Sequence, residues 1–166
     1  MPQFQEKSLL LATERLSASY FRLVLLAPQI AAQAQSGQFV MVACGTTLDP
    51  LLRRPFSIHR CPGDGSLHLL IKIVGKGSTL LAELTAGATL DLLGPLGRGF
   101  YLQPALPSVL VGGGVGIAPL LFLVERYKLD ARIGEDLLTP TPQTVVARYE
   151  SAIHCVLHFP ALRHSH

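Results

Sequence analysis

The chain has 166 residues, of which 49% are hydrophobic and 15% are charged, and its formal net charge is +3. This length fits one domain, or one small domain with part of another, and the low charged fraction excludes a disordered protein. The scattered basic residues form no stripe for nucleic acid, no apolar run reaches the roughly 18 residues of a membrane span, and the first residues lack a secretory-signal pattern. We therefore expect a cytoplasmic protein with no nucleic-acid partner and no membrane partner.

The first part of the chain contains short strand-like runs separated by turn signals. A Pro-Gly-Asp-Gly turn at 62–65 predicts a β-hairpin between the fourth and fifth runs. One short helix is predicted over 78–84, with Ser78 as its N-cap and Gly87 as its stop. The spacing predicts a mainly β fold, a small six-stranded antiparallel barrel. Its expected strands lie at 8–14, 19–27, 38–42, 54–60, 66–74 and 89–93, with further turns at 49–50 and 94–100.

The pattern changes near residue 104, where two prolines predict a linker. The apolar run 108–111 is typical of a strand that opens a parallel sheet. A glycine-rich turn at 112–116 follows, and then a helix over 119–127 with Pro119 in its first turn. A strand, a glycine turn and a helix form the first unit of a doubly wound nucleotide-binding domain.

Beyond about residue 129 no further alternation of strands and helices follows, and two prolines interrupt the segment. We therefore predict two parts. The first is a barrel over 1–103, and the second is an incomplete α/β nucleotide-binding segment with an irregular C-terminal tail over 104–166.

The run 54–57 carries chemistry that suits a phosphate ligand. Arg54 offers a planar fork of donors that matches a phosphate group. Pro55 fixes the backbone, Phe56 adds apolar surface for a flat ligand, and Ser57 offers a hydroxyl. An ordinary strand edge explains the same four residues, so both interpretations stay open.

The segment 70–79 leads from a strand through two glycines to the start of a helix, where backbone N–H groups can hold an anion such as a pyrophosphate. A P-loop is excluded, because that motif needs Ser or Thr directly after its Lys and a Gly five residues before it. Here Gly77 follows Lys76, and Ile71 stands five residues before it. A glycine-rich bend capped by Ser78 is the alternative interpretation.

The glycine run 112–116 is similar to a dinucleotide-binding turn. Ile117 stands where the third Gly of the G-x-G-x-x-G pattern would be, and Asp130 lies in range of the acidic residue that such a site uses. By itself the turn is a weak indication of nucleotide binding.

Four motifs occur in order along the chain: Arg-Pro-Phe-Ser at 54–57, Val-Gly-Lys-Gly-Ser at 74–78, Thr-Leu-Asp-Leu-Leu-Gly-Pro-Leu-Gly-Arg-Gly-Phe at 89–100 and Gly-Gly-Gly-Val-Gly-Ile-Ala-Pro at 112–119. In this order and spacing they resemble the ferredoxin–NADP reductase superfamily. Within it, the glycine-rich third motif is most similar to that of the electron-transfer subunits of dihydroorotate dehydrogenase B. The resemblance covers roughly residues 5–128.

The resemblance implies an FAD-binding barrel followed by a nicotinamide-nucleotide domain, with FAD and NAD(H) as cofactors. It also implies a hetero-oligomer with the dihydroorotate dehydrogenase catalytic subunit of pyrimidine biosynthesis, to which electrons pass from the nicotinamide through FAD. No catalytic residue is implied. Arg54, Gly77 and Ser78 would hold the FAD phosphates, and Pro55, Phe56 and Ser57 would line the isoalloxazine. Leu70, Ile71 and Lys72 would flank the cofactor from the next strand, and Gly112, Gly113, Gly114 and Gly116 would face the nicotinamide nucleotide.

The chain departs from that family in its cysteines and its length. The family's [2Fe–2S] cluster needs four closely spaced Cys ligands, whereas this chain has only Cys44, Cys61 and Cys155, which we expect to be reduced thiols. The 59 residues from Ser108 onward are too few for the family's nucleotide domain. A truncation, a frameshift or a degenerate copy would explain this. No metal site is predicted from the C-terminal histidines, His154, His158, His164 and His166.

Two other functions stay open at this point. One is a related reductase subunit, of the sulfhydrogenase gamma type or the NADH-dependent ferredoxin–NADP oxidoreductase alpha type. The other is a non-catalytic flavin-binding remnant, which turnover of NADH with an electron acceptor would exclude.

Overall fold

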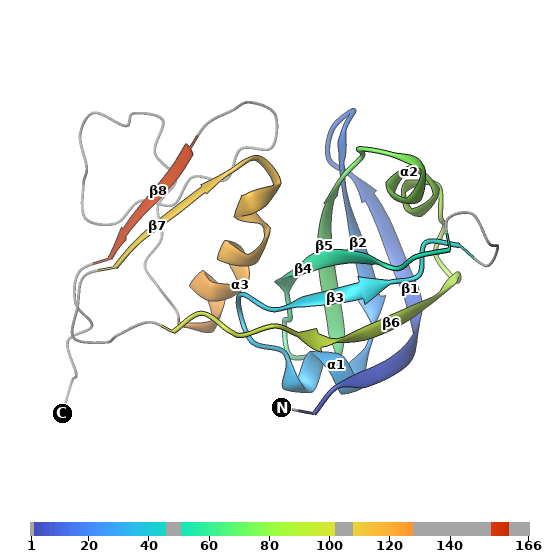
Figure 1. The fold of residues 1–166 in the computed structure, drawn as a ribbon, viewed down its shortest axis with the longest axis horizontal. Helices are drawn as coiled ribbons and strands as arrows, with labels where there is room; N and C mark the ends of the chain where they lie inside the picture. The colour runs from blue at the N-terminus through green and yellow to red at the C-terminus, as the bar shows by residue number, and fades with distance from the viewer. Residues whose placement is uncertain (1, 46–50, 102–107, 128–153, 160–166) are drawn as a thin grey trace.

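A closed barrel of antiparallel strands forms the main body of the protein (Figure 1). The computed structural model describes residues 2–45, 51–101, 108–127 and 154–159. The six strands follow the order β1-β2-β5-β4-β3-β6 around the barrel, which confirms the predicted mainly β fold. They are β1 (Phe4–Arg15), β2 (Tyr20–Leu26), β3 (Phe39–Val42), β4 (Arg54–Arg60), β5 (Ser66–Lys72) and β6 (Thr89–Leu96).

The barrel interior is filled by alternate residues of each strand, because successive side chains of a strand point to opposite faces. Full burial of each such Leu, Ile or Phe stabilises the fold by about 1.5–3 kcal/mol. Strand β5 is buried along almost its whole length, on both faces. The innermost side chains of β2 and β5 pair across the sheet as Phe21 with Ile71, Leu23 with Leu69 and Leu25 with Leu67.

Helix α1 (Pro28–Gln33) lies between β2 and β3 and was not predicted. It has no side-chain cap from its own N-terminal residues. Instead the buried Glu6 of β1 accepts hydrogen bonds from the backbone N–H groups of Ile30 at 3.1 Å and Gln29 at 3.3 Å. The capping residue is distant in sequence, so local patterns do not reveal this helix start.

Helix α2 (Lys76–Ala82) is the predicted short helix, but its start differs from the prediction. Gly75 occupies the N-cap position, so the prediction of Ser78 as N-cap is wrong; Ser78 is the third residue of the helix. Gly87 lies in the turn before β6 rather than at the helix end, and its N–H donates to the carbonyl of Leu10 at 2.8 Å. Strand β6 extends to Leu96, into the segment predicted as a loop.

The predicted strand, glycine turn and helix of the second part are confirmed as β7 (Ser108–Gly113), the 3-10 helix η1 (Gly114–Ile117) and α3 (Ala118–Arg126). In the described part of the chain, the expected parallel sheet is replaced by an antiparallel pair. Strand β7 pairs antiparallel with β8 (His154–Phe159), inside the segment predicted to be an irregular tail. One edge of β7 thus forms its backbone hydrogen bonds with a strand that lies far along the chain.

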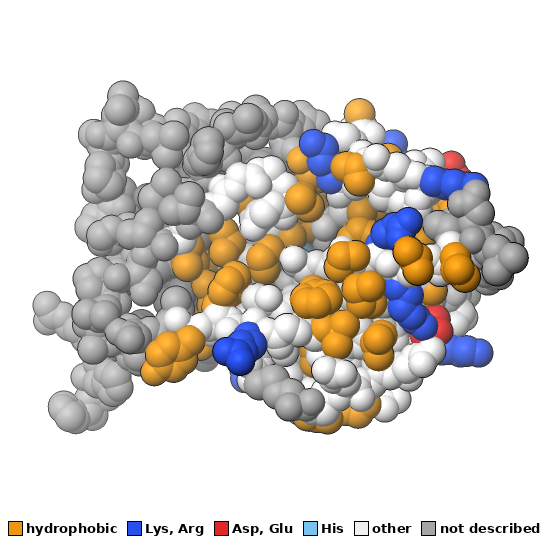
Figure 2. Space-filling model, viewed as in Figure 1, with side chains coloured by type: hydrophobic (Ala, Val, Ile, Leu, Met, Phe, Trp, Pro, Cys, Tyr) orange, Lys and Arg blue, Asp and Glu red, His pale blue; other side chains and the backbone are white. Residues whose placement is uncertain are grey.

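The predicted linker and the turn at 49–50 fall outside the described residues. Among the residues that are described, no helix combines the length and the apolar character that a bilayer crossing requires. Figure 2 shows hydrophobic side chains gathered over the face where Figure 1 draws β3, β4 and β6, with Lys and Arg side chains between them.

Candidate functional site

The start of β4 and the turn into α2 meet at one corner of the barrel. A side-chain carbon placed on the buried Gly77 would lie 3.7 Å from Cγ of Arg54 and 3.3 Å from Sγ of Cys44. Two of the predicted phosphate-binding segments are therefore in contact. Cys44, which follows β3, completes the corner, and the sequence reasoning had not assigned it to the site.

The two adjacent arginines at this corner have different roles. Arg53 donates to the carboxylate of Asp91 at 2.7 Å and to its backbone carbonyl at 2.8 Å. Arg54 is exposed, and the one hydrogen bond that its guanidinium makes among the described residues is to the carbonyl of Leu52 at 3.3 Å. Arg53 is thus engaged in holding β6, while most donors of the Arg54 guanidinium are available to a ligand.

The Asp91 carboxylate also accepts a hydrogen bond from the side chain of Gln5 at 2.9 Å. Burial raises the pKa of Asp91, but the hydrogen bonds from Arg53 and Gln5 outweigh it and hold the pKa below its usual range. The pair of Arg53 and Asp91 is therefore charged at neutral pH and fixes Arg53 in its structural role.

The hydroxyl of Ser78 is fully engaged within the turn. It accepts from the N–H groups of Val74 at 2.9 Å and Gly75 at 3.1 Å, and it donates to the carbonyl of Gly75 at 2.8 Å. A serine hydroxyl has one donor and two acceptor positions. Ser78 therefore braces the turn with its side chain, which leaves the main chain of this turn as the part that can meet a ligand.

The predicted row along β4 divides between two faces. Because successive side chains of a strand point to opposite faces, Phe56 packs against the barrel core, whereas Pro55 and Ser57 lie on the other face. On neighbouring β3, Pro55 pairs with Met41 and Ser57 with Phe39. Of the predicted residues on β5, Ile71 lies in the core, so only its main chain could meet a ligand. Leu70 is also buried, and Lys72 is exposed.

The glycine turn reaches the barrel beside Lys72. The ammonium of Lys72 lies 5.7 Å from the centroid of the Tyr20 ring. A side-chain carbon on Gly114, whose φ is +53°, would lie 3.7 Å from the hydroxyl oxygen of Tyr20. The predicted residues Lys72 and Gly114 thus lie near the same aromatic ring at the barrel edge.

The remaining glycines of the turn differ in their surroundings. A side-chain carbon on buried Gly112 would lie 2.7 Å from Cδ1 of Leu120, so this glycine permits close packing of β7 against α3. Gly113 and Gly116 are exposed, and a side-chain carbon on Gly116 would meet nothing within 4 Å. Within the described part of the chain, these two are the most exposed glycines of the turn.

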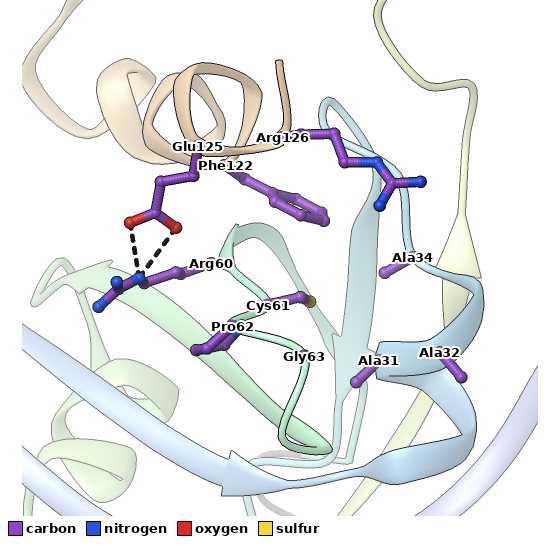
Figure 3. A pocket seen from close by; sticks show the side chains of 10 residues that line it. All are labelled: Ala31, Ala32, Ala34, Arg60, Cys61, Pro62, Gly63, Phe122, Glu125 and Arg126. Carbon is purple, nitrogen blue, oxygen red and sulfur yellow. Dashed lines mark hydrogen bonds and ion pairs between the residues drawn. The ribbon is translucent and has the colours of Figure 1, made fainter. Parts of the chain in front are cut away.

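A hollow of about 680 Å³ lies away from all the predicted site residues, between α1, α3 and the turn after β4 (Figure 3). At one edge of it, Arg60 of β4 and Glu125 of α3 form an ion pair of 2.7 Å. Burial, together with Asp64 and Glu125, raises the pKa of the Cys61 thiol to about 12, so this thiol is neutral and a weak nucleophile.

The comparisons with known proteins agree on the barrel. The family described as "Oxidoreductase FAD-binding domain" matches residues 9–101. Two curated relatives, both named "Dihydroorotate dehydrogenase B (NAD(+)), electron transfer subunit", come from Desulforamulus reducens and Bacillus caldolyticus. The first is 50% identical over 102 residues, which are 60% of this chain and 39% of the relative. The second is 41% identical over 120 residues, which are 69% of this chain and 47% of the relative.

Solved structures share the fold. An NADH-dependent reduced ferredoxin-NADP oxidoreductase matches with a TM-score of 0.65 at 22% identity, over 89% of this chain and 58% of that one. The Amycolatopsis cytochrome P450 reductase GcoB matches with a TM-score of 0.63 at 25% identity, over 75% of this chain and 39% of that one. The chain spans less than half the length of the two curated relatives.

Proposed function

Because the chain belongs to the oxidoreductase FAD-binding domain family, we propose that its barrel binds FAD and that it works as an electron-transfer subunit. In this proposal electrons pass from a nicotinamide nucleotide to a dihydroorotate dehydrogenase catalytic subunit. The relative from Desulforamulus reducens, which is named as the electron transfer subunit of dihydroorotate dehydrogenase B, supports the proposal with 50% identity over 102 aligned residues. The likeness to the ferredoxin-NADP oxidoreductase, at 22% identity, concerns the fold alone and does not favour that alternative.

The observation that carries the proposal is the contact of Arg54, Gly77 and Cys44. A guanidinium with free donors suits a phosphate oxygen, and a charge-assisted contact of this kind is about twice as strong as a neutral hydrogen bond. The absence of a side chain on Gly77 lets a ligand approach the backbone of the turn closely. Burial raises the pKa of Cys44, which the charge of Arg54 offsets only in part, so the thiol adds no negative charge beside a phosphate.

Bound FAD would supply the redox chemistry, since a flavin accepts the two electrons of a hydride and passes them on singly. The chain's own residues would bind and orient it. Arg54 would hold the phosphates with the turn of Gly77, and Pro55, Ser57, the main chain of Phe56 and the end of β5 would surround the ring. We propose the exposed Gly113 and Gly116 as the contacts to the nicotinamide nucleotide, within a second part over 104–166 that follows a barrel over 1–103.

Titration of the purified full chain with FAD tests the first half of the proposal. We expect quenching of flavin fluorescence that saturates near one FAD per chain, with a visible absorbance band that stays with the protein through gel filtration. Protein that remains colourless after reconstitution would contradict the proposed function.

Co-expression with a dihydroorotate dehydrogenase catalytic subunit tests the second half. We expect the two chains to co-purify, and NADH to reduce the flavin of the complex. The proposed compartment is the cytoplasm, where reduced thiols such as Cys44 and Cys61 persist. Flavin that binds but is not reduced by NADH would favour the interpretation as a non-catalytic flavin-binding remnant.

A further inference from the structure

Strand β4 is attached to helix α3 by its last residues. The Nδ1 of His59 lies 2.7 Å from the backbone carbonyl oxygen of Ala118, the first residue of α3. Two turns later on the same helix, Glu125 forms the ion pair with Arg60. The strand that begins with the proposed phosphate ligand Arg54 thus ends in contacts with the helix that follows the glycine turn.

The position of α3 determines where the glycine turn lies. Ala118 follows directly after η1, which begins at Gly114. Gly112 packs so closely on Leu120 of α3 that a side-chain carbon would approach it to 2.7 Å. A shift of α3 along the barrel would therefore carry the turn with it, away from Tyr20 and the end of β5.

His59 is built into this junction as a neutral donor. It is 2% exposed, and its Nε2 is buried with no hydrogen-bond partner among the described residues. Since a carbonyl only accepts, Nδ1 must carry the proton that is shared with Ala118. The charged or titratable groups that act on His59 come from four elements, namely Arg22 on β2, Arg60 on β4, His68 on β5 and Glu125 on α3.

We propose that His59 is a positioning residue for electron transfer, which holds the glycine turn at the barrel edge through its hydrogen bond to Ala118. It acts through α3 and does not touch a cofactor. Arg60 and Glu125, which are both partly exposed, support the junction with a weaker contact. The role of His59 in electron transfer rests on the proposed function. Its role in holding the glycine turn rests only on the contacts of His59 with Ala118 and of Gly112 with Leu120.

A pair of matched variants separates the hydrogen bond from the size of the side chain. His59→Asn keeps an N–H donor near the position of Nδ1, while His59→Gln carries its amide further out, near the position of Nε2. In hydrogen–deuterium exchange of the full chain, we expect His59→Gln to speed exchange over residues 114–126 roughly tenfold, the size of one lost buried hydrogen bond. We expect His59→Asn to stay near the native rate, and β1 and β2 to remain unchanged in both.

Equal exchange over 114–126 in the native chain and His59→Gln would overturn the inference, as would equal effects of Gln and Asn. His59→Leu, which removes every donor, is the stronger variant where it folds. Faster exchange throughout the barrel in His59→Gln would show a general loss of stability and would also count against a local hold on the turn.

The second readout uses the FAD-loaded chain and NADH. We expect His59→Gln to lower the rate of flavin reduction about tenfold without a change in FAD affinity, and His59→Asn to restore the rate. An unchanged rate together with faster exchange would overturn the role in electron transfer. If the native chain binds no FAD, the proposed function fails, and the exchange experiment still decides whether His59 holds the turn.

Discussion

Gly77 and Cys44 pack so closely that a side-chain carbon on Gly77 would lie 3.3 Å from the Cys44 sulfur and 3.4 Å from its Cβ. The two residues belong to different segments, since Gly77 lies in the first turn of α2 and Cys44 follows β3. Their contact closes the corner where Arg54 stands. The packing at Gly77 is therefore tight, and a side chain there would push the Cys44 side chain aside.

Gly77→Ala is expected to destabilise the protein by about 1–3 kcal/mol, because the added methyl group overpacks a closed contact. Thermal unfolding of the ligand-free chain should show a melting temperature lower by several degrees. Adding Cys44→Ala should recover part of this loss, so that the double variant is more stable than the sum of the single effects predicts.

Gly75→Ala is the matched control in the same turn, since a side-chain carbon on Gly75 would meet nothing within 4 Å. It should leave the melting temperature almost unchanged. Additive effects of the Gly77 and Cys44 substitutions would show that the two residues do not press on each other.

Arg54→Ala is expected to weaken FAD binding by roughly ten- to a hundred-fold, the effect of losing a hydrogen bond to a charged group worth about 1.5–3 kcal/mol. Arg54→Lys should recover part of the affinity, because it keeps the charge and loses the planar fork. Fluorescence titration with FAD measures both. Arg126→Ala removes another exposed arginine, which lines the hollow of Figure 3 away from the predicted site residues, and should have no effect. Equal affinities of Arg54→Ala and the native chain would exclude Arg54 as the phosphate ligand.

Glu6→Ala is expected to destabilise the barrel by about 1–2 kcal/mol, because it leaves the first N–H groups of α1 without an acceptor. Urea unfolding followed by circular dichroism measures the loss. Glu83→Ala removes a carboxylate with no side-chain hydrogen bond in the described part of the chain and serves as the control. A Glu6 variant as stable as the Glu83 variant would show that the cap contributes nothing.

The free energy of unfolding should fall as the pH drops below about 6.5. Burial lowers the pKa of His59 from its usual value of 6.5, with the hydrogen bond to Ala118 opposing this only in part, and burial also lowers the pKa of His68. The unfolded chain then binds more protons than the folded chain between the lowered and the usual pKa, so acid favours unfolding in that window. Well above pH 6.5 both histidines are neutral in both states, and this dependence disappears.

Urea titrations at pH 5.5 and 7.5 measure this difference in stability. His59→Asn, which keeps the donor and removes the titrating group, should make the difference smaller. A variant with the same loss of stability between the two pH values as the native chain would show that His59 does not titrate in this range.

Local patterns predicted the elements whose residues lie close together along the chain. The strand-like run at β2, the turn at 62–65 and the glycine turn before α3 all appear in the structure where the sequence indicates them. Helix α1 could not be predicted in this way, because the carboxylate that caps it belongs to Glu6 on another strand. Strand β8 was missed for a similar reason, since its partner β7 lies far away in the sequence.

The candidate site divides in the same manner. The sequence alone determined which residue types could hold a phosphate, because a guanidinium fork and a glycine-rich turn have that chemistry wherever they occur. Only the tertiary structure decided that Arg54 is available while Arg53 is bound to Asp91, that the Ser78 hydroxyl is used within its own turn, and that Cys44 lies behind Gly77. Which donors are free depends on contacts between segments far apart in the chain, and closure of the barrel brings those segments together.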